Sequence, residues 1–251
     1  TMGSLRHGPP ARAIQRLQAC RLRLEQLPHG RLQHFTTHVA MQDVEADLKE
    51  AARLGVGHVS AYTLQVEKGT PFALLGLKED PEREAWAMER AEEVLGEAGL
   101  FRYEVSNFAR EGEEARHNLV YWRAGFWLAL GPAATGQYPG EGGAYALRRT
   151  APPLPRWLRG EAPKEEAISP LEHAKESLML GLRLREGVDV GAVEERTGLA
   201  LFPLLQGRAE ELAQEGLLQV RGKRLLPTPK AFPLLHRVVL AMNGVLVAEL
   251  F

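Results

Sequence analysis

The sequence predicts an α/β protein: a mostly parallel sheet with helices, followed by a small helical, winged-helix-like domain. Between residues 41 and 109, helical periodicity alternates with short runs rich in β-branched and aromatic residues. The connections between these segments are short, which is typical of βα units. Residues 152–163 contain four prolines and are the natural domain boundary, because the pattern beyond them is helical. We therefore expect two domains, at residues 1–151 and 164–251.

The composition is that of a globular protein without a strong charge. The chain has 251 residues, of which 45% are hydrophobic, and a formal net charge of −1. A balanced charge creates no long-range field toward nucleic acid or an anionic membrane. The apolar runs are shorter than a bilayer span, and none lies near the N-terminus as in a signal peptide. We expect a cytoplasmic protein with no membrane segment.

The first forty residues have the weakest pattern. We expect a helix at residues 9–27 and a loop at residues 26–40. In that loop, His34 and His38 have the spacing of metal ligands, but no acidic residue accompanies them, so we interpret these histidines as incidental. The one cysteine, Cys20, cannot form an internal disulfide or hold an iron–sulfur cluster.

The elements after residue 41 are better defined. Apolar residues at helical spacing predict a helix from Val44 that stops at Gly55, a favourable C-terminal cap. The next elements are expected at residues 58–64 (strand), 81–99 (helix), 101–105 (strand) and 144–149 (strand).

The C-terminal part predicts helices around a two-stranded wing. Helices are expected around residues 171–182, 189–197 and 203–215, then a hairpin of residues 217–220 and 224–227, and a last helix after Pro229. The residues expected inside that last helix are Ala231, Leu234, Leu235, Val238 and Val239. The helix that would enter a DNA groove carries Glu210, Glu211 and Glu215 against one arginine. We therefore expect a packing module and no nucleic-acid binding.

A cluster of aromatic residues is the most unusual local composition in the chain. It consists of His117, Asn118, Tyr121, Trp122 and Trp127. Such a set can form a flat apolar slot with one imidazole ligand, which suits an iron porphyrin. The alternative is a packed aromatic corner with a hydrogen-bonded histidine. Composition alone favours that alternative, because aromatic side chains more often belong to a core.

Two further segments have candidate chemistry. Residues 131–137 have the glycine spacing of a phosphate-binding loop, but Gln137 stands where the lysine is needed, so we interpret them as a tight bend. Glu104, Ser106 and Asn107 lie at the C-terminal end of a predicted strand, where barrel enzymes place their sites. Hydrogen bonds to a turn backbone explain the same residues equally well.

Four short segments have recognisable motifs: residues 58–72 are similar to HIS-Y-L-EPGTPF, 103–109 to YEISNFA, 116–122 to RHNLNYW and 128–132 to LGLGPGA. In this order, they resemble the oxygen-independent coproporphyrinogen III oxidase and HemW family of radical-SAM proteins. Residues 176–184 with 216–228 are similar to that family's C-terminal domain. The resemblance implies that residues 1–151 form part of a radical-SAM (β/α) barrel. It also implies S-adenosylmethionine at the C-terminal ends of the strands, near Thr63 and Leu64.

The HNxxYW motif at residues 117–122 is associated with the HemW branch, a haem-binding chaperone. The resemblance therefore implies that His117 is the ligand to the haem iron, with Asn118, Tyr121 and Trp122 beside it. It also implies haem or a porphyrin, and haem-acceptor proteins, as partners. The alternatives are the family's enzyme, an oxidase that decarboxylates coproporphyrinogen III by radical chemistry, and a non-catalytic interaction module.

The sequence departs from the family in three places. The C-x3-C-x2-C motif, whose cysteines hold a [4Fe–4S] cluster, is absent. The strand expected before Met41 is missing, which makes residues 1–40 atypical, and the histidine of the glycine-rich loop is replaced in residues 131–137. We therefore expect the cluster and S-adenosylmethionine only in full-length members, and a fragment without radical activity here.

Overall fold

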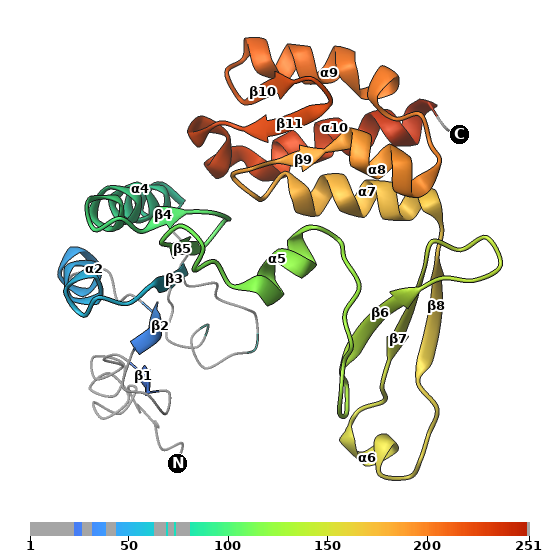
Figure 1. Ribbon diagram of the computed structural model, residues 1–251, viewed down its shortest axis with the longest axis horizontal. Coiled ribbons are helices and arrows are strands. Elements are labelled where there is room, and N and C mark those ends of the chain that lie inside the picture. Colours follow the sequence, from blue (N-terminus) through green and yellow to red (C-terminus); the bar gives the residue numbers. More distant parts are fainter. Residues whose placement is uncertain are drawn as a thin grey trace, which may run out of the picture. The chain divides into compact units, whose positions relative to one another are not determined.

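The computed structural model describes residues 23–26, 32–38, 44–62, 69, 73 and 81–249. The chain divides into two compact units after Glu114, and each unit has a hydrophobic core of its own (Figure 1). This division lies earlier than the boundary expected at residues 152–163, which are inside the second unit. Helices and sheets occur in both units, which agrees with the predicted α/β class.

The first unit is built on a five-stranded sheet with the order β1-β2-β3-β5-β4. Its strands are β1 (Arg23–Gln26), β2 (Leu32–His38), β3 (His58–Tyr62), β4 (Phe101–Arg102) and β5 (Asn107–Ala109). Among these described strands, β2 and β3 are the one parallel pair, and they are joined through helix α2 (Val44–Arg53). The prediction of a mostly parallel sheet is therefore wrong for the described strands, although β2-α2-β3 is a βα unit of the expected kind.

Two predictions for the N-terminal region are wrong. Arg23–Gln26 form strand β1 where a helix was expected, and Leu32–His38 form strand β2 where a loop was expected. The rest of residues 1–40 lies outside the described residues. Strand β2 pairs with β3 from Phe35 opposite Val59 onward. The backbone hydrogen bonds of that pairing decide the structure of a segment with no local period of its own.

The helices of the first unit confirm their predictions. Helix α2 ends close to Gly55, whose φ of +68° is a conformation that glycine adopts without a steric cost. Helix α4 (Pro81–Glu97) begins at the predicted proline. Leu48 of α2, Leu95 of α4 and Phe108 of β5 are fully buried in one core, which fastens both helices to the sheet.

The second unit begins with a short helix and an antiparallel sheet. Helix α5 (Arg116–Trp122) precedes β6 (Thr135–Pro139), β7 (Ala146–Thr150) and β8 (Lys164–Ile168), which pair in the order β6-β7-β8. The proline-rich residues connect β7 to β8 and include helix α6 (Leu154–Trp157) at one end of this sheet (Figure 1). They therefore connect two strands of one sheet.

The rest of the second unit is the predicted helical domain with its wing. Its helices are α7 (Pro170–Gly181), α8 (Val190–Thr197), α9 (Phe202–Gln214) and α10 (Leu235–Glu249), with a 3-10 helix η1 (Pro229–Leu234) before the last. The predicted hairpin is β10 (Leu218–Arg221) and β11 (Arg224–Pro227), and β9 (Val188–Asp189) adds a third strand. The residues expected inside the last helix are buried, except that Leu234 is 40% exposed.

One segment passes a simple test for a membrane span, although we expected all apolar runs to be too short. Pro229–Val247 is long and apolar enough by length and composition, and 39% of it is buried. Val238, Met242 and Leu246 of this segment are fully buried in the helical core. A core helix has the same composition, so the test is weak evidence for a span.

Candidate functional site

Two members of the HNxxYW motif lie one turn apart on helix α5. His117 and Tyr121 are both exposed, and their ring centroids are 6.4 Å apart at an interplanar angle of 79°. The Tyr121 ring meets the ring of Trp127 edge-on, at 5.0 Å and 88°. We call these three residues the aromatic row. Edge-to-face contacts are the favourable geometry for aromatic pairs, so the row is a stable arrangement.

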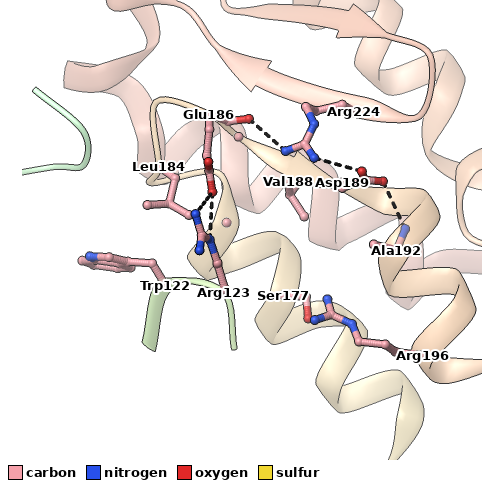
Figure 2. A pocket seen from close by; sticks show the side chains of 12 residues that line it. Trp122, Arg123, Ser177, Leu184, Glu186, Val188, Asp189, Ala192, Arg196 and Arg224 are labelled. Carbon is pink, nitrogen blue, oxygen red and sulfur yellow. Dashed lines mark hydrogen bonds and ion pairs between the residues drawn. The ribbon is translucent and has the colours of Figure 1, made fainter. Parts of the chain in front are cut away.

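Trp122 lies on a different side of α5 from this row. It is five residues after His117, which is about 140° around a helix. It lines a separate hollow of about 160 Å³ whose other walls include Ser177, Leu184 and Val188 (Figure 2). Ligand pockets typically measure roughly 300–1,000 Å³. The hollow is therefore too small for a porphyrin.

Ion pairs surround this hollow. Arg123 pairs with Glu186 at 2.9 Å, and Arg224 pairs with Asp189 at 2.9 Å (Figure 2). Asp189 also caps helix α8, because its carboxylate accepts from the backbone N–H of Ala192 at 3.1 Å. These contacts join the end of α5 to the segment around β9, and β9 to β11. The charged residues around the hollow therefore have a structural role.

The predicted site residues are therefore brought together only in part. His117 and Tyr121 share the aromatic row, Asn118 is partly buried on the same helix, and Trp122 faces the separate hollow. The residues expected near S-adenosylmethionine, Thr63 and Leu64, lie outside the described residues. Helix α5 itself was not predicted. The spacing of four between His117 and Tyr121 is the signal that could have indicated a shared helix face.

Within the second unit, His117 lies on an exposed face of α5 and not in the packed aromatic corner that composition alone favoured. Its helix neighbour Val120 is 37% exposed and Tyr121 is 44% exposed. After the helix, Leu128 and Leu130 are 70% and 83% exposed. An accessible imidazole beside apolar and aromatic side chains can offer a nitrogen ligand to an iron centre and an apolar surface to a flat ring.

The other two candidate segments are explained by the fold. Gln137, which stands where a phosphate-binding lysine is needed, is 1% exposed and lies in strand β6. The predicted bend is therefore present, but it leads into strand β6, which was not predicted.

The polar residues between β4 and β5 form a closed network. Glu104 is 1% exposed, and its carboxylate accepts from the backbone N–H of Ser106 at 3.1 Å and from the side-chain amide of Asn107. Ser60 on β3 donates to the Asn107 side chain. Burial raises the pKa of the Glu104 carboxyl above its usual value, and the hydrogen bond from Asn107 partly offsets this. These bonds agree with the interpretation of the segment as a turn.

The residues of this chain do not fit a radical-SAM cluster. Such a cluster needs three thiolates, and the chain's one cysteine, Cys20, lies outside the described residues. Among the residues that the structure describes, no three histidine, cysteine, aspartate or glutamate side chains are grouped so that they could hold a metal ion.

A solved structure shows the class of fold. The chain matches coproporphyrinogen III oxidase (HemN) from Escherichia coli, a radical SAM enzyme, with a TM-score of 0.60 over 84% of this chain and 54% of that chain. The sequence identity is 16%, so this likeness establishes the fold alone. The predicted radical-SAM-type α/β fold is confirmed.

Sequence relatives specify the family. The HemN C-terminal domain matches residues 168–234. The heme chaperone HemW of Synechocystis is 37% identical over 156 residues, which are 58% of this chain and 37% of the relative. The heme chaperone HemW of Mycobacterium tuberculosis is 34% identical over 218 residues, 80% of this chain and 51% of the relative. The chain belongs to the HemW- and HemN-like radical-SAM family, and it spans about half, or less, of the length of these relatives.

Proposed function

We propose that this chain binds haem through the imidazole of His117 and passes it to acceptor proteins in the cytoplasm. The observation that carries the proposal is the aromatic row, which places an accessible imidazole at its exposed end. Neutral imidazole is a common ligand to haem iron. The relatives named heme chaperone HemW support the same assignment.

The aromatic row would support the porphyrin as well as the iron. Val120 and Tyr121 lie three and four residues after His117, on the same face of α5, and offer apolar area to the ring. Trp127 is held in place because its indole N–H donates to the backbone carbonyl of Thr135 at 2.7 Å. The surface that meets the ligand would therefore be rigid before binding, which lowers the entropic cost of binding.

The open face fits a carrier. A site that encloses a drug-sized ligand commonly buries roughly 70–90% of its surface. A porphyrin on α5 would keep more of its surface accessible, and an acceptor protein could then reach it. In this proposal Tyr121 contacts the porphyrin directly, and Asn118 lies beside the porphyrin. Trp122 does not touch the porphyrin but lines the separate hollow and so helps to hold α5 in place.

In this proposal, only full-length family members hold the iron–sulfur cluster and S-adenosylmethionine. The residues that correspond to Thr63 and Leu64 would lie near S-adenosylmethionine in those proteins. This chain would act as a haem-binding fragment without radical chemistry. The oxidase alternative has no independent support, because the likeness to HemN concerns the fold.

Titration with haemin tests the proposal. The Soret band of haemin should shift on binding, and His117→Ala should weaken the affinity at least tenfold, about 1.4 kcal/mol, through loss of the iron ligand. His236→Ala is the matched control, because His236 is also exposed but lies on α10. Equal affinity of the His117 variant and the unmodified protein would refute the assignment.

A further inference from the structure

The C-terminal end of helix α5 is attached to the sheet through a buried side chain. Gln137 on β6 donates from Nε2 to the backbone carbonyl of Gly125 at 3.0 Å. Its Oε1 accepts from Nη2 of Arg148 on β7 at 2.8 Å. The same Nη2 donates to both carboxylate oxygens of Glu176 on α7, at 3.0 and 2.8 Å. We call the three side chains Gln137, Arg148 and Glu176 the relay.

We propose that Gln137 is a positioning residue for haem binding, which orients the aromatic row through the end of α5. The inference rests on the proposed function of His117. Gln137 touches neither His117 nor Tyr121 in the contacts described, so its effect would pass through Gly125 and Trp127.

Gly125 is the residue that closes the helix. Its N–H donates to the carbonyl of Val120 at 2.8 Å, and the N–H of Ala124 donates to the carbonyl of Tyr121 at 3.0 Å. A Cβ on Gly125 would lie 3.1 Å from the Val120 carbonyl oxygen, so the chain passes very close to the helix end here. A bond to the Gly125 carbonyl therefore constrains the last turn of α5, where Tyr121 lies.

The backbone of Gln137 holds the other end of the aromatic row. The N–H of Trp127 donates to the Gln137 carbonyl at 2.9 Å, and the N–H of Gln137 donates to the Trp127 carbonyl at 3.0 Å. One residue thus fixes Trp127 through its backbone and the end of α5 through its side chain. The contact between Tyr121 and Trp127 depends on both attachments.

The chemistry of the position requires an amide. The side chain at residue 137 must donate to a carbonyl and accept from a guanidinium at the same time. A carboxylate cannot donate, and an ammonium cannot accept. Gln137 is 1% exposed, so a donor or acceptor left without its partner there cannot be compensated by bulk water.

The relay also joins α5 to the helical domain. Glu176 lies on α7, inside the residues that match the HemN C-terminal domain. The side chains of Arg148 and Glu176 are 24% and 26% exposed, so their ion pair is partly shielded from solvent. The aromatic row is therefore oriented by a helix of the C-terminal domain as well as by its own sheet.

The variant Gln137→Glu tests the inference, because it keeps the shape and the contact with Arg148 but removes the donor to Gly125. We expect haemin to bind roughly tenfold more weakly, and the amides of residues 120–125 to exchange faster with deuterium. In a His117→Ala background, the same change should have a smaller effect on haemin affinity, because only the contact of Tyr121 with the porphyrin is left to misplace. Arg149→Gln is the matched control, since Arg149 is the next residue on β7 and pairs with the exposed Glu165 at 2.6 Å.

A second variant guards against loss of the fold. Arg148→Lys keeps a positive charge beside Glu176 but loses the guanidinium fork, and it should weaken haemin binding in the same direction by a smaller factor. Unchanged haemin affinity and unchanged exchange at residues 120–125 in Gln137→Glu would overturn the inference. If the unmodified protein fails to bind haemin through His117, the proposed function falls. The exchange measurement then still decides whether Gln137 positions α5.

Discussion

His173 is the residue whose chemistry depends most on its surroundings. It is fully buried on α7, and its ring stacks on Tyr145 with centroids 3.6 Å apart. Tyr145 in turn stacks on Phe126 at 5.7 Å. The Nε2 atom of His173 forms a hydrogen bond with Ser177 Oγ at 3.2 Å. Burial, with a smaller effect from the charge of Arg196, lowers the pKa of His173 to about 4, so the ring is neutral at pH 7.

The lowered pKa of His173 predicts a loss of stability in acid. An unfolded histidine titrates near pH 6.5, so between that pH and about 4 the unfolded chain binds more protons than the folded chain. The stabilisation is therefore complete above pH 6.5 and is lost as the pH falls toward 4. We expect the loss to be about 3 kcal/mol in the free energy of unfolding, because each unit of difference in pKa corresponds to about 1.4 kcal/mol.

His173→Phe keeps the stack on Tyr145 and removes this titration. Urea unfolding at pH 7 and pH 4, followed by tryptophan fluorescence, should show a smaller acid-induced loss in the variant than in the unmodified protein. His236→Phe changes an exposed histidine instead and should leave the loss unchanged. The same loss in His173→Phe as in the unmodified protein would contradict the prediction.

At the scale of elements, the connection between α7 and β9 depends on one glycine. Gly187 has a φ of +67°, and a Cβ there would lie 1.9 Å from the carbonyl oxygen of Leu225 on β11. Gly198 at the end of α8 has a similar φ of +71°, but a Cβ there meets nothing within 4 Å. The two positions share the backbone conformation and differ in the space around them.

Alanine substitutions at Gly187 and Gly198 therefore distinguish the cost of a positive φ from the cost of steric overlap. Gly198→Ala should lower the free energy of unfolding by about 1 kcal/mol, the cost of a left-handed alanine. Gly187→Ala should lower it by roughly 3 kcal/mol or more, because β9 must also move away from β11. Thermal unfolding of the two variants measures the difference, and equal losses would show that β9 adjusts freely.

Local sequence signals predicted some elements and missed others. Helix α7 carries its own start signal, a capping box in which Ser169 and Glu172 bond to each other's backbone N–H groups at 3.2 and 2.8 Å. Strand β2 has no such signal, and its structure depends on pairing with β3. Helix α5 is seven residues long with no side-chain cap, so its pattern was too short to indicate a helix.

At the scale of the molecule, the chain has the family's fold, and its 251 residues contain one cysteine. We expect anaerobic reconstitution with iron and sulfide to leave less than one [4Fe–4S] cluster per chain, since a single cysteine cannot replace three. Iron and sulfide analysis of the purified protein measures this. Cys20→Ser should bind haemin as the unmodified protein does. A full cluster per chain would show that thiolates are not its required ligands here.

The sequence by itself determined the family, the helices α7 to α10, the hairpin and the candidate His117. These features depend on short motifs or on contacts between residues close in the sequence, so the local sequence pattern predicts them. Only the tertiary structure decided that Trp122 faces away from His117, that β2 pairs with β3, and that Gln137 holds the end of α5. A strand or a buried polar side chain takes its partner from a distant part of the chain, as Ser60 does from Asn107, 47 residues away. The sequence pattern does not identify such a partner, because the two residues become neighbours only in the folded chain.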